Sequence, residues 1–217
     1  KHPREFPIDA EHQFIVLSKE VLAEHYDEAS DWHFWSPRMV RLADWFVGHE
    51  RAHRQENAIQ KLEADGEIAF TPSSDIIDKE FYLTARADRI DKRHDGTGAV
   101  IIDYKSGGAY SLKGMITGKM PQLPLEALMI ERGGFSGVQS DKVASLEYWK
   151  LTGGRDEGDV TQLAKSADVE QAVMNAEIGL LNLIRTFDDL ATPYYSIPNL
   201  DNAPRFNDYE HLARVKE

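Results

Sequence analysis

The amino-acid sequence predicts a mixed α/β fold, in which helices flank a central mixed β-sheet and a helical extension precedes it. Apolar residues at helical spacing occupy the N-terminal part of the chain and a stretch near its C-terminus. Between these helical stretches, residues 81–91, 99–105 and 142–153 have the composition and alternation of strands. Helices that precede and follow a cluster of strands are typical of an α/β domain.

The first 65 residues are expected to form the helical extension of one compact domain. Residues 11–26 are predicted to be its first helix. A second, long helix is predicted to start after the N-cap Ser36, with Pro37 at its first helical position, and to run to about Ala64. Gly66 is then expected to end this helix, and residues 66–217 to form the core with a C-terminal helix and tail.

The core is expected to be built around a β-hairpin. The segments "FYLTARADRID" and "AVIIDYK" flank a turn that contains an Asp-Gly pair, which is a common hairpin signal. A Gly-rich loop at 106–119 follows, and a helix is predicted from Pro121 to the Gly-Gly pair at 133–134. The last long helix is predicted from about Ala167 to Ala191.

The composition limits the classes of function. The chain has 217 residues and no cysteine, which excludes disulfides, cysteine nucleophiles and an iron–sulfur cluster, and favours a reducing, cytoplasmic compartment. A net charge of −12 disfavours broad electrostatic wrapping of nucleic acid, but it allows local contact with a phosphate through a metal. The sequence contains no apolar run of the length that a membrane span needs, so no membrane partner is expected.

Charged residues at the end of a buried strand indicate a reaction centre. In "IIDYKSG", Asp103 and Lys105 are two residues apart, so they point to the same side of a strand. If the hairpin register brings Asp88 next to Asp103, the two carboxylates require a cation between them, and a hard divalent metal fits. Lys105 would then stand beside an attacking water. The alternative is a surface ion pair, which on this short motif alone is the favoured interpretation.

The order of "ARADRID", "IIDYKSG" and "PQLPLEA" resembles that of the RecB-family nucleases of the PD-(D/E)XK superfamily. Three segments, "FWSPRMVRLADWFVGHE", "PQLPLEALMIERGGF" and "YEHLARVKE", resemble the C-terminal nuclease domain of alphaproteobacterial AddB-type subunits within that family. The resemblance implies a restriction-endonuclease-like core and cleavage of DNA with Mg²⁺, or Mn²⁺ in its place. It implies that Asp88, Asp103 and the backbone carbonyl of Tyr104 bind the metal, that Lys105 is the catalytic lysine and that Gln122 organises the site. It also implies an AddA-like helicase–nuclease subunit as partner in double-strand break repair.

Two departures from the family pattern affect this interpretation. The family has a metal-binding histidine on an upstream helix, and no histidine of this sequence matches it. The sequence is therefore expected to be a fragment of a longer protein that starts after this histidine, and the isolated fragment is expected to bind metal weakly and to be poorly active. The family also has a tyrosine four residues after the glutamine, where this sequence has Glu126. The cluster of cysteines that holds iron and sulfur in some AddB relatives is absent.

Other interpretations remain open at this point. "HERAH" matches the zinc-protease pattern, with His49 and His53 as ligands and Glu50 as the base, although no third ligand follows it. Glu50 could instead present an acid from a helix toward the nuclease metal. Lys113 and Lys119 on the Gly-rich loop are weak candidates for contact with the DNA backbone. Finally, the domain could be a degenerate nuclease fold that serves as a scaffold.

Overall fold

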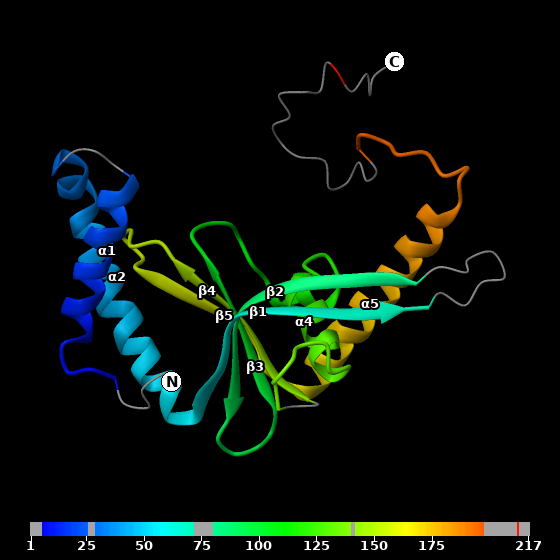
Figure 1. Ribbon diagram of the computed structural model, residues 1–217, viewed down its shortest axis with the longest axis horizontal. Coiled ribbons are helices and arrows are strands. Elements are labelled where there is room, and N and C mark those ends of the chain that lie inside the picture. Colours follow the sequence, from blue (N-terminus) through cyan, green and yellow to red (C-terminus); the bar gives the residue numbers. More distant parts are fainter. Residues whose placement is uncertain (1–5, 26–28, 72–79, 140–141, 198–211, 213–217) are drawn as a thin grey trace.

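A five-stranded β-sheet forms the centre of the protein (Figure 1). The computed structural model describes residues 6–25, 29–71, 80–139, 142–197 and 212. The strands lie in the order of the sequence: β1 (Asn57–Phe70), β2 (Phe81–Arg93), β3 (Ala99–Lys105), β4 (Val143–Leu151) and β5 (Gly158–Leu163). Because β3 and β4 are parallel and the other neighbours antiparallel, the sheet is mixed.

Helices cover both sides of this sheet. The helices are α1 (Ala10–His25), α2 (Ala29–Glu56), α3 (Leu112–Ile116), α4 (Gln122–Glu131) and α5 (Ser166–Asp188). Figure 1 shows α1 and α2 together at one end of the molecule and α5 at the other, with α4 beside it. In the described part of the chain, no helix has both the length and the apolar character needed to cross a membrane.

Two apolar clusters hold these layers together, and β3 contributes to both. Ile101 belongs to the larger cluster, which includes residues of α4 and α5. Val100 and Ile102 point to the other face and pack with Trp149 and with Phe46 of α2. Both faces of β3 are therefore buried, which explains its nearly continuous apolar sequence. The arrangement confirms the predicted α/β class and is consistent with a restriction-endonuclease-like core.

The predicted boundaries of the second helix are wrong at both ends. The helix begins at Ala29, so Pro37 lies within it, and it ends at Glu56. Residues 57–65, which we expected to be helical, form the first part of the 14-residue strand β1, which passes through the expected domain boundary at residue 66. Gly66 is a strand residue: a Cβ atom there would lie 2.5 Å from the ring of Phe135, so the close approach of this ring requires a glycine.

The other elements follow the sequence prediction more closely. The hairpin β2–β3, the strand β4 and the helices α1, α4 and α5 are confirmed within a few residues. The polar strand β5 was not predicted, and the Gly-rich loop at 106–119 contains the short helix α3. Of the tail that was expected after the last helix, residues 198–217 lie outside the described residues except for Leu212.

A buried ionic network fastens α2 to the sheet. Arg89 of β2 is only 2% exposed, and its Nη1 atom donates a hydrogen bond to Oε2 of Glu50 at 2.6 Å. Its Nε and Nη2 atoms donate to the two carboxylate oxygens of Asp91 at 2.8 and 2.6 Å. The Nε2 atom of His53 lies 2.9 Å from Oδ2 of Asp91. Burial alone would raise the pKa of Asp91, but the hydrogen bonds with His53 and Arg89 lower it.

Arg89→Ala is expected to destabilise the fold strongly, because it leaves the buried carboxylates of Glu50 and Asp91 without their shared cation. We expect a loss of about 3–5 kcal/mol in the free energy of unfolding, measured by urea denaturation. Arg86→Ala is the matched control: Arg86 lies on the same strand and pairs with Glu63, but both side chains are 62% exposed. It should cost less than about 1 kcal/mol, and equal losses in the two variants would contradict a structural role for the network.

Candidate active site

The hairpin register brings Asp88 and Asp103 to the same place on the sheet. The pairing of β2 with β3 ends at Arg89 and Ile102, so Asp88 and Asp103 are the next residues of an antiparallel ladder. Oδ2 of Asp88 accepts a hydrogen bond from the backbone N–H of Tyr104 at 2.9 Å. The side chain of Asp88 thus bridges to β3 just beyond the paired residues.

Asp103, Lys105 and Gln122 form one connected set. The Nζ atom of Lys105 lies 2.6 Å from Oδ2 of Asp103, and it donates a hydrogen bond to Oε1 of Gln122 at 3.2 Å. The Nε2 atom of Gln122 donates to Oδ1 of Asp103 at 2.5 Å. Because Gln122 contacts both charged groups, it fixes the ammonium and the carboxylate relative to each other.

The helix α4 positions Gln122 over the end of β3. Gln122 is the first residue of α4, directly after Pro121 at the N-cap position. The following residues Leu123 and Ala127 are fully buried in the larger apolar cluster. Burial of this face anchors the helix against the sheet, which directs the side chain of Gln122 toward Asp103.

Glu126 is a fourth polar member of this cluster. It lies one helical turn after Gln122 and is only 3% exposed. Its Oε1 atom accepts a hydrogen bond from Nε2 of Gln122 at 3.3 Å, whereas Oε2 is buried and has no hydrogen-bond partner among the described residues. Burial, together with the charges of Asp103 and Asp88, raises the pKa of Glu126 to about 7.

The charges of the cluster influence one another. Burial raises the pKa of Asp103, and the nearby charge of Asp88 raises it further, against the opposing effect of Lys105. Partial burial disfavours the charged form of Lys105, but the contact with Asp103 outweighs this effect and raises the pKa of its ammonium. Lys105 therefore stays protonated at neutral pH. The carboxylates of Asp88, Asp103 and Glu126 gather around this one cation.

The donor set fits a hard divalent cation, although it does not form a ready-made site. Within the described residues, no three acidic, histidine or cysteine side chains lie close enough together to hold a metal ion. Lys105 and Gln122 occupy positions beside the carboxylates that a cation would take. However, Oε2 of Glu126 is a buried oxygen without a hydrogen-bond partner among the described residues, and Oδ2 of Asp103 faces the ammonium of Lys105 at 2.6 Å. Oxygen ligands of this kind suit Mg²⁺ or Mn²⁺.

The remaining candidates lie apart from this cluster. Glu50 is on the α2 side of the sheet, where its carboxylate binds Arg54 and Arg89, while Asp103 packs on the α4 side. Lys113 and Lys119 are exposed on the segment between β3 and α4. Among the described residues, the cluster is contacted by Lys105 and not by either of these two lysines.

The residues of the HExxH pattern contact other side chains of the protein and do not form a zinc site among the described residues. His53 and Glu50 belong to the ionic network of Arg89. The ring of His49 stacks on Trp45, with centroids 5.1 Å apart, and meets the edge of Trp149 at 4.3 Å. Burial, followed by the proximity of His53, lowers the pKa of His49. The protease interpretation is therefore not supported, because the residues that it requires are used to join α2 to the sheet.

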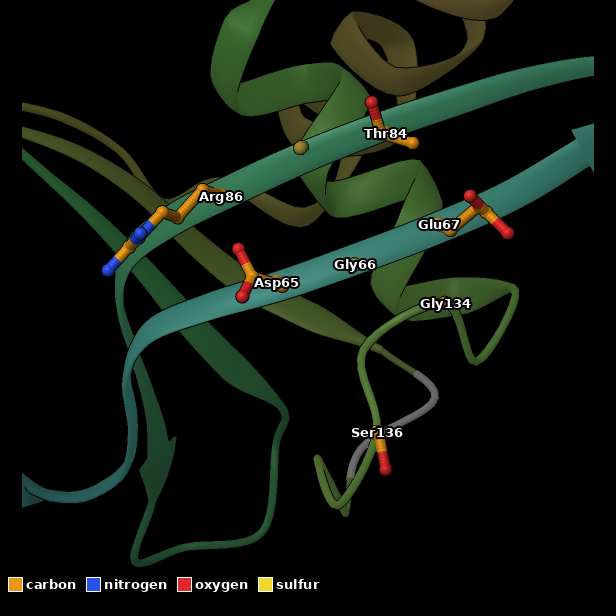
Figure 2. Close-up of a pocket in the computed structure, with 8 residues that line it drawn as sticks. Asp65, Gly66, Glu67, Thr84, Arg86, Gly134 and Ser136 are labelled. Atoms are coloured by element: carbon orange, nitrogen blue, oxygen red, sulfur yellow. The ribbon is translucent and has the colours of Figure 1, made fainter.

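A separate surface depression does not coincide with the candidate site. Figure 2 shows it on the ribbon formed by β1 and β2, with Gly134 and Ser136 from the segment after α4 beside it. Its volume is about 650 Å³ and it is lined by Asp65, Gly66, Glu67, Thr84, Ala85, Arg86, Gly134 and Ser136. None of the predicted site residues lines it, so the connected set around Asp103 remains the better candidate.

Sequence reasoning named Glu126 but did not foresee its burial. Its neighbours in "QLPLEALMI" offered a signal, because apolar residues surround it on nearly every side of the helix. A helix that is apolar all round is buried, and a carboxylate in such a helix must face a polar site.

Glu126→Gln is expected to change the pH dependence of stability in metal-free buffer. The pKa of Glu126 is about 7 in the folded protein against an ordinary 4.5, so the wild type loses stability as the pH rises through this range. The variant lacks this titration, so its free energy of unfolding relative to that of the wild type should rise by about 2.5 kcal/mol between pH 5 and pH 8. Denaturant titrations with a chelator present measure it, and a difference independent of pH would contradict the assignment.

Comparisons with known proteins identify the superfamily of the chain. The family model described as the PD-(D/E)XK nuclease superfamily matches residues 2–195, a range that includes the whole candidate site. No curated protein matches the chain. A solved structure titled "Crystal structure of SSO0001" is 13% identical, with 79% of this chain and 70% of that chain covered and a TM-score of 0.35, which is too low to add to the assignment. Because the family model matches most of the length of the chain, the chain belongs to the PD-(D/E)XK nuclease superfamily.

Proposed function

We propose that this protein is a metal-dependent nuclease that hydrolyses phosphodiester bonds of DNA. The observation that carries the proposal is the connected set of Asp103, Lys105 and Gln122, with Asp88 beside it, in a chain of a nuclease superfamily. Carboxylates that can hold a metal next to a fixed ammonium are the groups that phosphodiester hydrolysis requires.

Asp88 and Asp103 are the residues that would hold Mg²⁺ or Mn²⁺, with the backbone carbonyl of Tyr104 as a further ligand. A divalent cation in such a site supplies the positive charge that polarises a phosphoryl oxygen and acidifies an attacking water. The side chain of Asp88 is held by the backbone N–H of Tyr104, so this contact prearranges one ligand before any metal binds.

Lys105 serves as a fixed positive charge and hydrogen-bond donor. Its raised pKa keeps the ammonium protonated, so it orients the water and stabilises the negative charge that develops on the phosphate. Gln122 positions Lys105 and Asp103 through its two hydrogen bonds. In this mechanism, Gln122 acts by holding the geometry of the two charged groups.

The finer assignment is to the nuclease domain of an AddB-type subunit of an AddAB helicase–nuclease, acting as an exonuclease in the cytoplasmic repair of double-strand breaks. It is supported by the sequence segments that resemble this family. The net charge of −12 fits it as well, because so acidic a chain attracts DNA poorly and needs a partner to deliver the strand. An AddA-like subunit would supply that function.

Asp103→Asn and Lys105→Ala are each expected to lower Mg²⁺-dependent cleavage of linear DNA at least about a hundredfold, because each removes charge from the reacting centre. Release of nucleotides by the full-length protein in its complex, with the nuclease site of the partner subunit inactivated, measures this loss. Asp65→Asn, on the β1–β2 ribbon outside the site, serves as the control and should retain the wild-type rate. Circular dichroism verifies that the variants are folded.

The nucleotide-release assay distinguishes an active nuclease from a domain that serves only as a scaffold. If the wild type releases no nucleotides with Mg²⁺ although its complex is intact, the domain is a degenerate nuclease fold. If the wild type cleaves DNA and Asp103→Asn cleaves it equally well, then the cleavage belongs to another site and the assignment of these residues is wrong.

DNA binding is expected to depend on the partner. The protein alone should bind linear DNA weakly, and an AddA-type subunit should raise the affinity at least about tenfold, because the partner contributes the positive surface that the acidic chain lacks. Fluorescence anisotropy of labelled DNA, at one fixed salt concentration, measures both affinities. Tight binding by the protein alone, unchanged by the partner, would contradict the proposed division of labour.

A further inference from the structure

Glu126 has no assigned role in the nuclease mechanism, yet the structure buries it in the site. Only 3% of the residue is exposed, and its Oε2 atom has no partner in the described part of the chain. A buried carboxylate oxygen without a donor is costly. An oxygen of this kind is available to a ligand that enters the site.

The hydrogen bonds of Gln122 place Glu126 beside Asp103. The Nε2 atom of Gln122 is shared between two carboxylates, at 2.5 Å from Oδ1 of Asp103 and 3.3 Å from Oε1 of Glu126. A single polar nitrogen therefore stands between Asp103 and Glu126. A divalent cation can bridge two neighbouring carboxylates and balance their charge, which a neutral amide cannot do, and Oε2 of Glu126 is free of hydrogen bonds to the described residues.

The charge of the cluster points the same way. Asp88, Asp103 and Glu126 are close enough for their charges to interact, and Lys105 is the cation that the described residues place against them. When all are ionised, Lys105 neutralises one carboxylate and two negative charges remain. One divalent cation balances these charges.

We propose that Glu126 is a third carboxylate ligand of the divalent cation at Asp88 and Asp103, supplied by α4. This inference rests on the proposed nuclease function, because it assumes that Asp103 binds a metal. In the described structure the three carboxylates do not converge on one point, since the amide of Gln122 lies between two of them. Metal binding therefore requires the side-chain amide of Gln122 to move away from the space between Asp103 and Glu126.

The test is the binding of Mn²⁺ by the purified protein, measured at pH 8 by calorimetry and by electron paramagnetic resonance of the free ion. Glu126→Gln keeps the size of the side chain and removes its charge, and it should weaken Mn²⁺ binding at least about tenfold. Glu131→Gln is the matched control, because Glu131 is exposed at the end of the same helix. The affinity of Glu131→Gln for Mn²⁺ should stay within about twofold of the wild-type affinity, since this substitution removes a carboxylate outside the site.

A third variant, Asp103→Asn, separates this inference from the proposed function. If Asp103→Asn weakens Mn²⁺ binding and Glu126→Gln does not, then Glu126 is not a ligand and the inference is overturned, while the proposed metal site stands. If Asp103→Asn leaves binding unchanged, or the wild type binds no Mn²⁺, both are overturned. Denaturant titrations verify at pH 8 that Glu126→Gln is folded, and loss of affinity in the folded variant supports the inference.

Discussion

The antiparallel register of β2 against β3 is the constraint on which the rest of the structure depends. Asp88 and Arg89 are neighbours in β2, so they point to opposite faces of the sheet. In this register Asp88 meets β3 on the α4 side, where Asp103 lies, and Arg89 meets Glu50 on the α2 side. A slip of one residue would exchange the two, which would place a buried cation at the site and an unpaired carboxylate under α2.

The two faces divide the tasks of stability and chemistry. On the α2 side, Arg89 donates hydrogen bonds to the buried carboxylates of Glu50 and Asp91, and these bonds fix α2 to the sheet. On the α4 side, the carboxylates outnumber their cation and Oε2 of Glu126 lacks a hydrogen-bond partner among the described residues. Tyr104 links the two faces, because its backbone N–H donates to Asp88 and its hydroxyl accepts from Arg89 at 3.1 Å. The rigid network therefore supports the residues from which the site is built.

Short-range patterns in the sequence predicted much of the site, and longer-range contacts explain what was missed. The two-residue spacing of Asp103 and Lys105 is sufficient to place them on one side of β3, and the Asp-Gly turn predicts the hairpin that brings Asp88 near. The end of α2 could not be predicted, because residues 57–65 become a strand only by pairing with β2. The partner of Glu50 lies 39 positions away, and the unpartnered oxygen of Glu126 depends on how α4 packs. Neither fact is encoded in a local pattern.

The position of a bound Mn²⁺ ion tests the central claim most directly. Anomalous X-ray scattering from crystals soaked in MnCl₂ would locate the ion without assumptions about activity. The account predicts a peak at the carboxylates of Asp88 and Asp103, on the α4 side of the sheet and beside Lys105. A peak at His49 and His53 on the α2 side, or no peak at Asp103 in crystals whose site is open to solvent, would contradict it.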